Sequence, residues 1–502
     1  MSDYNHGRNE EFRDRLIVVS NRLPVVLLKD KQGQLTAAPG SGGLVTALSP
    51  VLKDRGGLWI GWPGDIDASK HSIDAVLACV SKSSGFDLEP VVLSPEEIQQ
   101  FYYGFSNEII WPLFHDLLSR CNFDPSYWSS YCNVNRKYAL AIQQQLKIND
   151  FIWIHDYHLM NVAQELRSLG VTNKIGFFLH TPFPQLDIFM KLPWKWEILK
   201  SLLTYDCLGF QSLRDKRNFI QCVRTLISNV HFEDGRSIRT IRIADRTVRI
   251  GTFPISIDSR AFAAIASSSA VEQRTEDIRS HLKDVKIILG IDRLDYTKGI
   301  PERLKAFRRA LIRYPELHRK VVLVQFVVPS RSNIAEYNDL KIEIERLVGE
   351  INGQFTADGW VPIHYIFRSL DSAELIAYYR TADIGFITPM KDGMNLIAKE
   401  YCACSIDGKG VLILSEFAGA AAQVQKWALL VNPFDQDRTA DAIFQAFSMP
   451  VAEQQRRMSK IRSTLNRYDI YWWVNAFLEN SIAKRLNSFP VIEDYMPQHE
   501  MA

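Results

Sequence analysis

Short, continuous apolar runs recur along this chain, and amphipathic stretches separate them. Continuous runs are typical of strands covered by helices on both faces, and their alternation with helical segments predicts parallel sheets made of right-handed βαβ units. One such helix opens at Pro301, after which Leu304, Phe307 and Leu311 fall on one face. The predicted strands are 16–20, 58–62, 151–155, 175–180, 207–211, 286–291, 321–328, 363–367, 384–388, 411–415 and 429–431.

The runs form two sets, which predicts an α/β fold of two doubly wound, Rossmann-like domains facing a cleft. An apparent hairpin over 237–251 ends the first set, and a helical region over 267–282 opens the second. We therefore place the junction near 253–258. The predicted division is a first domain at 1–256, a second at 257–467, a C-terminal helix at 468–490 that packs back on the first domain, and a frayed tail at 491–502.

Composition narrows the class of protein. The chain has 502 residues and a formal net charge of +2, which argues against nucleic acid or a membrane surface as a partner. The polar start of the chain and the lack of a span of about 18 apolar residues argue against a secretory signal or a membrane helix. Seven cysteines are scattered, and Cys402 and Cys404 lack zinc-knuckle spacing. We expect reduced thiols, a cytoplasmic location and no metal.

Candidate chemistry in the first domain lies just after the predicted strands. Arg22 follows the first strand, where it could bind a phosphate with two hydrogen bonds or simply be a solvated loop residue. The glycines over 40–43 precede a helix and would admit an anion or form a flexible turn. Asp156 could hold sugar hydroxyls or cap the next helix. His180 ends the next strand in the same way, and a lone histidine is more often structural.

Three aromatic residues, Trp62, Tyr103 and Trp111, could line a sugar pocket, although core packing is the commoner role.

The second domain offers two further segments. Arg293 and Lys298 flank a strand end and precede a glycine and a helix, which suits a diphosphate, with a salt-bridged turn as the alternative. The segment after the strand at 384–388 makes an Asp-Gly turn, and a helix is expected to begin near Met394. Asp392 would then face a sugar and Glu400 the ribose hydroxyls, unless both lie on an ordinary helix surface.

Taken together, these segments resemble the trehalose-6-phosphate synthase family, glycosyltransferase family 20, whose members are retaining enzymes of the GT-B type. The resemblance extends from Arg15 to about Phe477. It is carried by VVSNRLP, GGLVTAL, GGLWIGWPG, FYYGFSN, WIHDYHL, GFFLHTPFP, CLGFQ, RLDYTKGIPERL, VVPSR, INGQF, TPMKDGMNLIAKEY and LSEFAGAA.

The resemblance implies roles for individual residues and no metal or other cofactor. The implied donor-binding residues are Gly42, Gly43, Arg293, Lys298, Leu370, Asn395, Leu396, Ile397, Ala398 and Glu400. The implied acceptor-binding residues are Arg22, Trp62, Tyr103, Trp111, Asp156 and Arg331. The implied catalytic residues are Asp156, His180, Arg293, Lys298 and Asp392. The first domain would thus bind the acceptor and the second the nucleotide sugar.

The implied reaction transfers glucose, with retention, from a nucleoside-diphosphate glucose such as UDP-glucose to glucose 6-phosphate. A related glucosylglycerol-phosphate synthase and a catalytically inactive sugar-phosphate sensor are the alternatives. The expected partners are small-molecule substrates, with trehalose-6-phosphate phosphatase as a pathway neighbour and a homo-oligomer left open. Two segments depart from the family pattern: a longer loop over 25–39, and Ala422-Gln423-Val424 in place of an Asn-Glu-Leu-like run.

Overall fold

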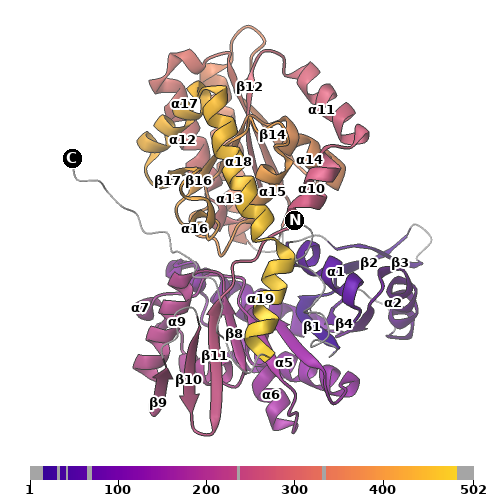
Figure 1. Ribbon diagram of the computed structural model, residues 1–502. Helices are drawn as coiled ribbons and strands as arrows, with labels where there is room; N and C mark the ends of the chain where they lie inside the picture. Colours follow the sequence, from indigo (N-terminus) through magenta and orange to yellow (C-terminus); the bar gives the residue numbers. More distant parts are fainter. Residues whose placement is uncertain are drawn as a thin grey trace, which may run out of the picture. The chain divides into compact units, whose positions relative to one another are not determined.

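The computed structural model describes residues 15–30, 34–40, 43–64, 70–233, 238–330 and 335–482 (Figure 1). The chain divides into two compact units, with one crossing after Phe253 and another after Trp473. Among the described residues, the first unit therefore combines those up to Phe253 with residues 474–482, and the second unit contains residues 254–473. The first crossing falls within the junction region 253–258 indicated by the sequence.

Among its described residues, the first unit contains a nine-stranded sheet in the order β5-β4-β1-β6-β7-β8-β11-β10-β9. Neighbours run parallel from β5 to β11, and β10 and β9 extend the sheet as antiparallel strands. The strands are β1 (Leu16–Arg22), β4 (Leu58–Trp62), β5 (Asp87–Pro90), β6 (Phe151–His155), β7 (Ile175–Phe178), β8 (Cys207–Phe210), β9 (Val230–Glu233), β10 (Arg239–Ile243) and β11 (Arg246–Thr252).

The second unit contains, within the part of the chain described, a six-stranded sheet in the order β14-β13-β12-β15-β16-β17. All its neighbours run parallel. Its strands are β12 (Lys286–Arg293), β13 (Val321–Val328), β14 (Ile363–Phe367), β15 (Ile384–Ile387), β16 (Val411–Ser415) and β17 (Leu429–Val431). The predicted strands are all present, with some ends shifted by one or two residues, because the apolar runs of most of them are buried on both faces, although β14 is buried only at Ile363.

Both sheets reverse their strand order beside the first strand of each set. In the first unit the order changes between β1 and β6, and in the second between β12 and β15. The carboxyl ends of the two strands at such a switch point form a crevice where doubly wound folds bind ligands. The candidate residues Arg22 and Asp156, and likewise Arg293 and Asp392, follow these strands.

Helices flank both sheets (Figure 1). Those of the first unit are α1 (Gly43–Arg55), α2 (Lys70–Ser84), α3 (Pro95–Glu97), η1 (Ile98–Ile110), α4 (Trp111–Phe114), η2 (Leu118–Arg120), α5 (Pro125–Gln145), η3 (Tyr157–Leu159), α6 (Val162–Ser168), α7 (Leu186–Phe189), α8 (Lys195–Leu202) and α9 (Leu213–Leu226). Of these, η1 is a π-helix, and η2 and η3 are 3₁₀ turns.

The second unit contains α10 (Ser259–Ala266), α11 (Ser269–His281), η4 (Tyr296–Lys298), α12 (Ile300–Arg313), η5 (Pro315–Leu317), α13 (Ala335–Phe355), α14 (Ser372–Thr381), α15 (Leu396–Cys404), α16 (Ala421–Val424), α17 (Gln436–Ser448) and α18 (Val451–Arg467). The predicted apolar face of α12 is confirmed, since Leu304, Phe307 and Leu311 are all buried.

The last described helix, α19 (Ile470–Ile482), contains the second crossing and packs on the first unit's sheet. Phe477 is fully buried, and its ring stacks on Trp153 of β6 with centroids 4.5 Å apart and planes 8° apart. Glycines on the two neighbouring strands make room for it, because a Cβ at Gly176 or Gly209 would lie 2.8 Å from the Phe477 ring. The Arg249 guanidinium also donates to the Asn480 carbonyl at 2.8 Å.

The segment 25–39 is not the long loop expected from the sequence. Its ends form the strands β2 (Val25–Lys29) and β3 (Leu35–Pro39), which pair antiparallel in a small sheet of their own. Leu27 is buried while Val26 and Leu28 are exposed, an alternation typical of a hairpin with one covered face. The short edge strands β5 and β9 were also not predicted, because neither contains a continuous apolar run.

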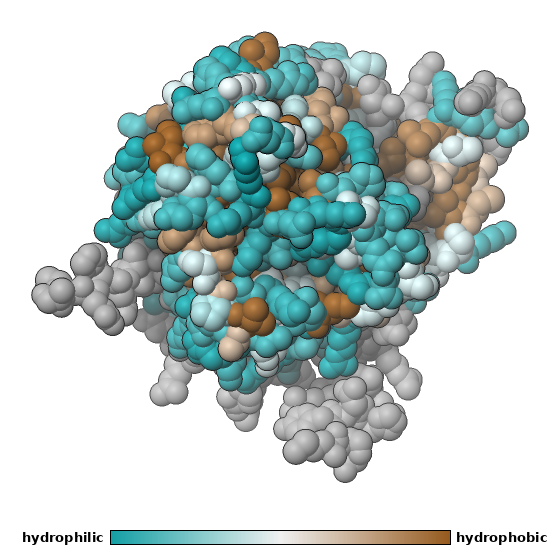
Figure 2. Space-filling view, turned by 90° about the horizontal axis from the view of Figure 1, so that it is seen from above, coloured by the Kyte–Doolittle hydropathy of each residue, from teal (hydrophilic) through white to brown (hydrophobic). Residues whose placement is uncertain are grey.

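One face of the molecule and the length of its helices bear on whether the chain could cross a membrane. The face shown in Figure 2 is mainly hydrophilic, with apolar residues in scattered groups, which is ordinary for a folded chain. Within the described ranges, no helix combines the length and apolar character needed to cross a membrane.

Candidate active site

In the second unit, the loops that follow β12 and β15 meet at the switch point. β12 ends at Arg293 and leads through η4 to Gly299, whose φ of 62° lies in the left-handed region that favours glycine. The Met390 amide, just after β15, donates to the Thr297 carbonyl at 2.8 Å. The two loops are therefore joined by their backbones before any ligand is considered.

Lys298 and Asp392 form an ion pair across these two loops. Their Nζ and Oδ2 atoms lie 2.6 Å apart, and the side chains are only 12% and 15% exposed. Asn395 donates from Nδ2 to the same carboxylate oxygen at 3.2 Å. The structure thus brings a predicted cation, a predicted sugar-facing acid and a predicted helix-start residue into direct contact.

Arg293 makes a different ion pair, with Asp295, over 3.1 Å between Nη2 and Oδ2. Asp295 is fully buried and also accepts hydrogen bonds from the Thr297 amide and hydroxyl. The salt-bridged turn considered as an alternative is therefore present at Arg293. The ion pair holds Arg293 at the strand end, because the Asp295 carboxylate is buried and bonded to Thr297.

The predicted helix start near Met394 lies at Leu396, the first residue of α15. Asn395 precedes it with φ 70°, and its side-chain oxygen accepts from the Ala398 amide at 3.2 Å. The first N–H groups of a helix point along its axis and favour an anion. Leu396, Ile397 and Ala398 are the first residues of α15, and of their amides that of Ala398 already donates to the Asn395 side chain.

Glu400 lies further along α15 and is held by a residue that the sequence analysis missed. The Tyr379 hydroxyl, from α14, donates to its Oε2 at 2.9 Å. Burial raises the pKa of Glu400, and this hydrogen bond opposes the shift. A fixed carboxylate with a remaining oxygen suits the role of a hydroxyl acceptor. Leu370 follows β14, at the same carboxyl edge of the sheet.

In the first unit, Arg22 ends β1 and is held flat against aromatic rings. Its guanidinium carbon lies 3.8 Å from the Trp62 ring centroid and 5.4 Å from that of Tyr102. Trp62 is only 2% exposed, so its ring supports the arginine from within the unit. The β1 terminus is fixed as well, since the Tyr138 hydroxyl donates to the Asn21 carbonyl at 2.8 Å.

The predicted aromatic residues Tyr103 and Trp111 lie on and just after the π-helix η1. Helices of this type are rare and frequently occur at functional sites. Asn107 joins η1 to the loop after β6, because its side-chain oxygen accepts from the Tyr157 hydroxyl at 3.0 Å. Trp111 packs beside Tyr157 and is 6% exposed, whereas Tyr103 is half-buried.

Asp156 adopts a strained backbone, with φ 73° and ψ 168°. Such conformations cost about 1–3 kcal/mol in a non-glycine residue and cluster at functional sites. Its side chain does not cap η3, which removes the capping alternative, and instead its Oδ1 accepts from the His180 amide at 3.2 Å. The ends of β6 and β7 are thereby joined at the predicted catalytic positions.

His180 pairs with the fully buried His155, with Nε2 and Nδ1 3.1 Å apart. Burial lowers the pKa of His180 to about 3 and that of His155 well below its usual value. Both rings are therefore neutral near pH 7. His180 can act as a neutral hydrogen-bonding group but not as a standing cation.

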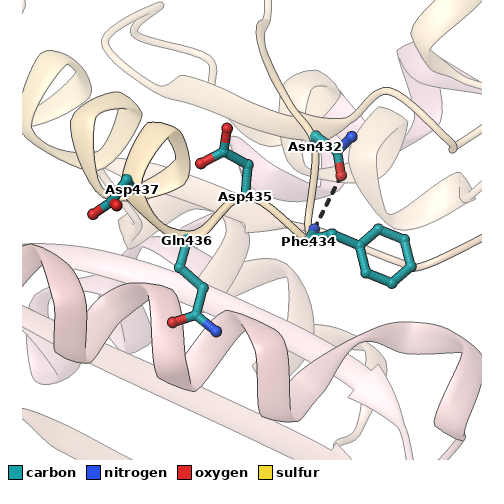
Figure 3. Close-up of a pocket in the computed structure, with 5 residues that line it drawn as sticks. All are labelled: Asn432, Phe434, Asp435, Gln436 and Asp437. Atoms are coloured by element: carbon teal, nitrogen blue, oxygen red, sulfur yellow. Dashed lines mark hydrogen bonds between the residues drawn. The ribbon is translucent and has the colours of Figure 1, made fainter.

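Two predicted residues, Gly42 and Arg331, lie outside the described residues, and Gly43 begins α1. A pocket of about 420 Å³, open to the surface, lies elsewhere in the second unit (Figure 3). It is formed by residues just before and at the start of α17. None of the predicted site residues lines it. Its lining residues are Asn432, Phe434, Asp435, Gln436 and Asp437.

The two units carry complementary chemistry. The second offers two cations, a helix start and a fixed carboxylate, as a nucleoside diphosphate requires. The first offers a supported arginine, aromatic rings and a strained aspartate, as a phosphorylated sugar requires. Two Rossmann-like units so equipped define a nucleotide-sugar glycosyltransferase of the GT-B class, and the prediction of two doubly wound α/β domains is confirmed. The chain belongs to glycosyltransferase family 20, whose family model matches residues 14–482.

Relatives in sequence agree with this assignment. The chain is 40% identical over 469 residues to a trehalose-6-phosphate synthase of Mycobacterium avium, covering 92% of this chain and 94% of that one. It is 40% identical over 477 residues to the trehalose-6-phosphate synthase of Mycobacterium tuberculosis strain H37Rv, covering 94% and 95%.

Solved structures are similar over both units. An α,α-trehalose-phosphate synthase (UDP-forming) from Burkholderia xenovorans, in complex with glucose-6-phosphate, matches with TM-score 0.83 and 34% identity, covering 93% of this chain and 99% of that one. An E. coli structure bound with UDP-2-fluoro glucose matches with TM-score 0.83 and 35% identity, covering 94% and 100%. The predicted family is confirmed.

Proposed function

We propose that this chain transfers glucose, with retention, from UDP-glucose to glucose 6-phosphate and so forms trehalose 6-phosphate. The observation that carries the proposal is the match, over more than nine-tenths of the chain, to one solved structure in complex with glucose-6-phosphate and another bound with UDP-2-fluoro glucose. The residues at the two switch points supply the chemistry that these two compounds need.

The donor would bind at the switch point of the second unit. Lys298 is engaged by Asp392 over 2.6 Å, so an incoming diphosphate would replace that carboxylate as its partner. Asp392 would then be released to accept hydrogen bonds from sugar hydroxyls. Arg293 and the first amides of α15 would bind the remaining phosphate oxygens, and Glu400 would accept from the ribose.

The acceptor phosphate would bind Arg22 and Arg331. The stacking of Arg22 on Trp62 leaves the edge of the guanidinium, which carries its N–H groups, available for bidentate hydrogen bonds. Tyr103 and Trp111 would contact the sugar ring, and Asp156 would lie between the acceptor and donor sugars.

We propose a front-face reaction. The bond between the glucose anomeric carbon and the diphosphate oxygen breaks, and the acceptor hydroxyl oxygen forms the new bond on the same face. The hydroxyl proton passes to the leaving phosphate oxygen, while Arg293 and Lys298 stabilise the charge that develops there. A double displacement would require a carboxylate nucleophile instead. A covalent glucosyl-enzyme trapped on Asp156 or Asp392 would refute the front-face reaction.

The test is a matrix of donors and acceptors with the purified full chain. UDP-, GDP- and ADP-glucose would each be offered with glucose 6-phosphate and with glycerol 3-phosphate, with nucleotide release as the readout and NMR of the product anomer. We expect the highest kcat/KM with UDP-glucose and glucose 6-phosphate, and an α,α product. Faster turnover of glycerol 3-phosphate would assign the chain as a glucosylglycerol-phosphate synthase. The absence of release with every pair would indicate a sensor.

We further propose that the reaction needs no metal and occurs in the cytoplasm. Two cations at the diphosphate position would neutralise the charge that a metal otherwise neutralises, so EDTA should leave the rate unchanged. All seven cysteines are free, which supports a reducing compartment. A trehalose-6-phosphate phosphatase would then consume the product. A homo-oligomer is a further hypothesis, which light scattering would test.

A further inference from the structure

A buried cation lies beneath the donor site and belongs to none of the assigned groups. Arg303, on α12, is 1% exposed, and its Nη1 lies 2.7 Å from Oδ2 of Asp292, which is equally buried. Burying an ion pair costs desolvation energy that the mutual attraction does not reliably recover. Burial indeed raises the pKa of Asp292, although Arg303 and Lys298 both oppose the shift. A contribution to folding stability is therefore not enough to explain why Arg303 and Asp292 form a buried ion pair.

The remaining donors of Arg303 connect the two loops of the switch point. Its Nε donates to the Thr388 hydroxyl at 3.1 Å, just after β15. Its Nη2 donates to the Lys298 carbonyl at 3.4 Å, at the end of η4. Its Nη1 also donates to the buried Gln325 side-chain oxygen at 3.2 Å. One guanidinium thus contacts the backbone of the diphosphate lysine and the loop that carries Asp392.

The surrounding packing leaves room only for this network. A Cβ at Gly290 would collide with the Gln325 side-chain oxygen and lie 2.9 Å from Arg303 Nη1. A Cβ at Gly299 would meet the Thr388 carbonyl oxygen and lie 3.0 Å from Met390 Sδ. Close-packed surroundings of this kind transmit a change at one group to its neighbours.

We propose that Arg303 is a positioning residue of the donor site, whose buried guanidinium holds the Lys298 and Asp392 loops in register for a nucleoside diphosphate. This inference rests on the proposed function, because the diphosphate is the donor's. Lysine could replace the charge of Arg303 but not its planar fork, which donates to three acceptors while it pairs with Asp292. The role is therefore specific to arginine.

The central variant is Arg303→Lys, which keeps the charge. Its matched control is Arg309→Lys on the same helix, where the arginine is 46% exposed and pairs with Asp437 at the surface. Thr388→Val is a second variant, which removes one acceptor of Arg303 and leaves the ion pair intact. The readouts are the Kd of UDP by calorimetry, kcat and KM for each substrate, and the melting temperature.

We expect Arg303→Lys to lower kcat/KM for UDP-glucose by about 10²-fold, as when a reacting group is displaced by about 1 Å, and to weaken UDP binding. The KM of glucose 6-phosphate should stay close to that of the wild type. Thr388→Val should weaken UDP binding in the same direction by a smaller factor, and Arg309→Lys should change neither substrate.

The proposal is overturned if folded Arg303→Lys binds UDP like the wild type. It is also overturned if both substrates weaken equally in step with the melting temperature. If Arg303→Lys does not fold, Thr388→Val decides by the same criteria. UDP binding is measured without any transfer reaction, so it tests this inference separately from the proposed function. A wild type that binds UDP but forms no trehalose 6-phosphate would refute the proposed function. The role of Arg303 would then still be decided by the UDP binding of the variants.

Discussion

Phe477→Ala tests how much the first unit depends on α19. The ring is fully buried against Trp153 and fills the space left by Gly176 and Gly209. Replacing a buried phenylalanine by alanine costs about 3–5 kcal/mol, because transfer energy is lost and a cavity remains. For a unit of about 250 residues, each kcal/mol lowers the melting temperature by about 2–4 °C, so we expect a fall of roughly 6–20 °C.

The assay is thermal unfolding of the full chain followed by circular dichroism. Asn475→Ala is the matched control, since Asn475 is exposed on the same helix and should shift unfolding by no more than about 0.5 kcal/mol. Gly176→Ala should be destabilising in the wild type but less so beside Phe477→Ala, because only the Phe151 ring, 2.9 Å from the added Cβ, would then still obstruct its methyl group. A shift of about 2 °C corresponds to a loss of about 1 kcal/mol at most. A melting temperature of Phe477→Ala within about 2 °C of the wild type would therefore refute the reasoning.

The other predictions concern charged and titrating groups. Arg293→Ala should lower kcat by about 10²-fold or more, since one preorganised charge is lost, and an unchanged rate would remove its diphosphate role. Arg331→Ala should raise the KM of glucose 6-phosphate far more than that of UDP-glucose, and equal effects would contradict the acceptor assignment. Lys399, 1% exposed, donates to the Ile255 carbonyl at 2.5 Å, and burial lowers its pKa to about 7. Between pH 7 and 10.5 the Lys399 amine is protonated in the unfolded chain but largely neutral in the folded one. The free energy of unfolding of the wild type, measured in denaturant titrations, should therefore increase relative to that of Lys399→Met as the pH rises. In the folded chain His180 has a pKa of about 3, so below pH 6.5 it binds fewer protons than in the unfolded chain. Its contribution to stability should therefore be lost as the pH falls from 6.5 towards 3. The titration of His180 should leave no step in the reaction rate between pH 6 and 8. His180→Gln should reduce the loss of unfolding free energy at acid pH. An unchanged loss would exclude His180 as its cause.

The parallel sheets could be predicted because most of their strands are buried on both faces and so appear as continuous apolar runs. The hairpin β2–β3 could not be recognised in the same way, since Leu27 is the one residue of β2 that is buried. The π-helix η1 was missed because its apolar residues also fit an ordinary helical period. Asn107 within these turns accepts a hydrogen bond from Tyr157, a tertiary contact that the local sequence pattern does not reveal.

The residues of the candidate site also differ in how far the sequence could predict them. Residues that directly follow strands, such as Arg293 and Asp392, could be predicted, because a parallel sheet gathers all its strand ends at one edge. The residues that support them could not. Tyr379 reaches Glu400 from a neighbouring helix, and Arg303 reaches Lys298 from the buried side of α12. Contacts of this kind depend on side-chain packing between elements, which no local pattern encodes.

The docking of α19 has a consequence for how the chain matures on the ribosome. The first unit's sheet is complete once Thr252 has been synthesised, yet the helix that covers Trp153 emerges only after residues 254–473 have been made. At about 5–20 residues per second, the apolar face that receives Phe477 stays uncovered for roughly 10–45 s. During that interval the nascent chain presents an apolar surface suited to a chaperone.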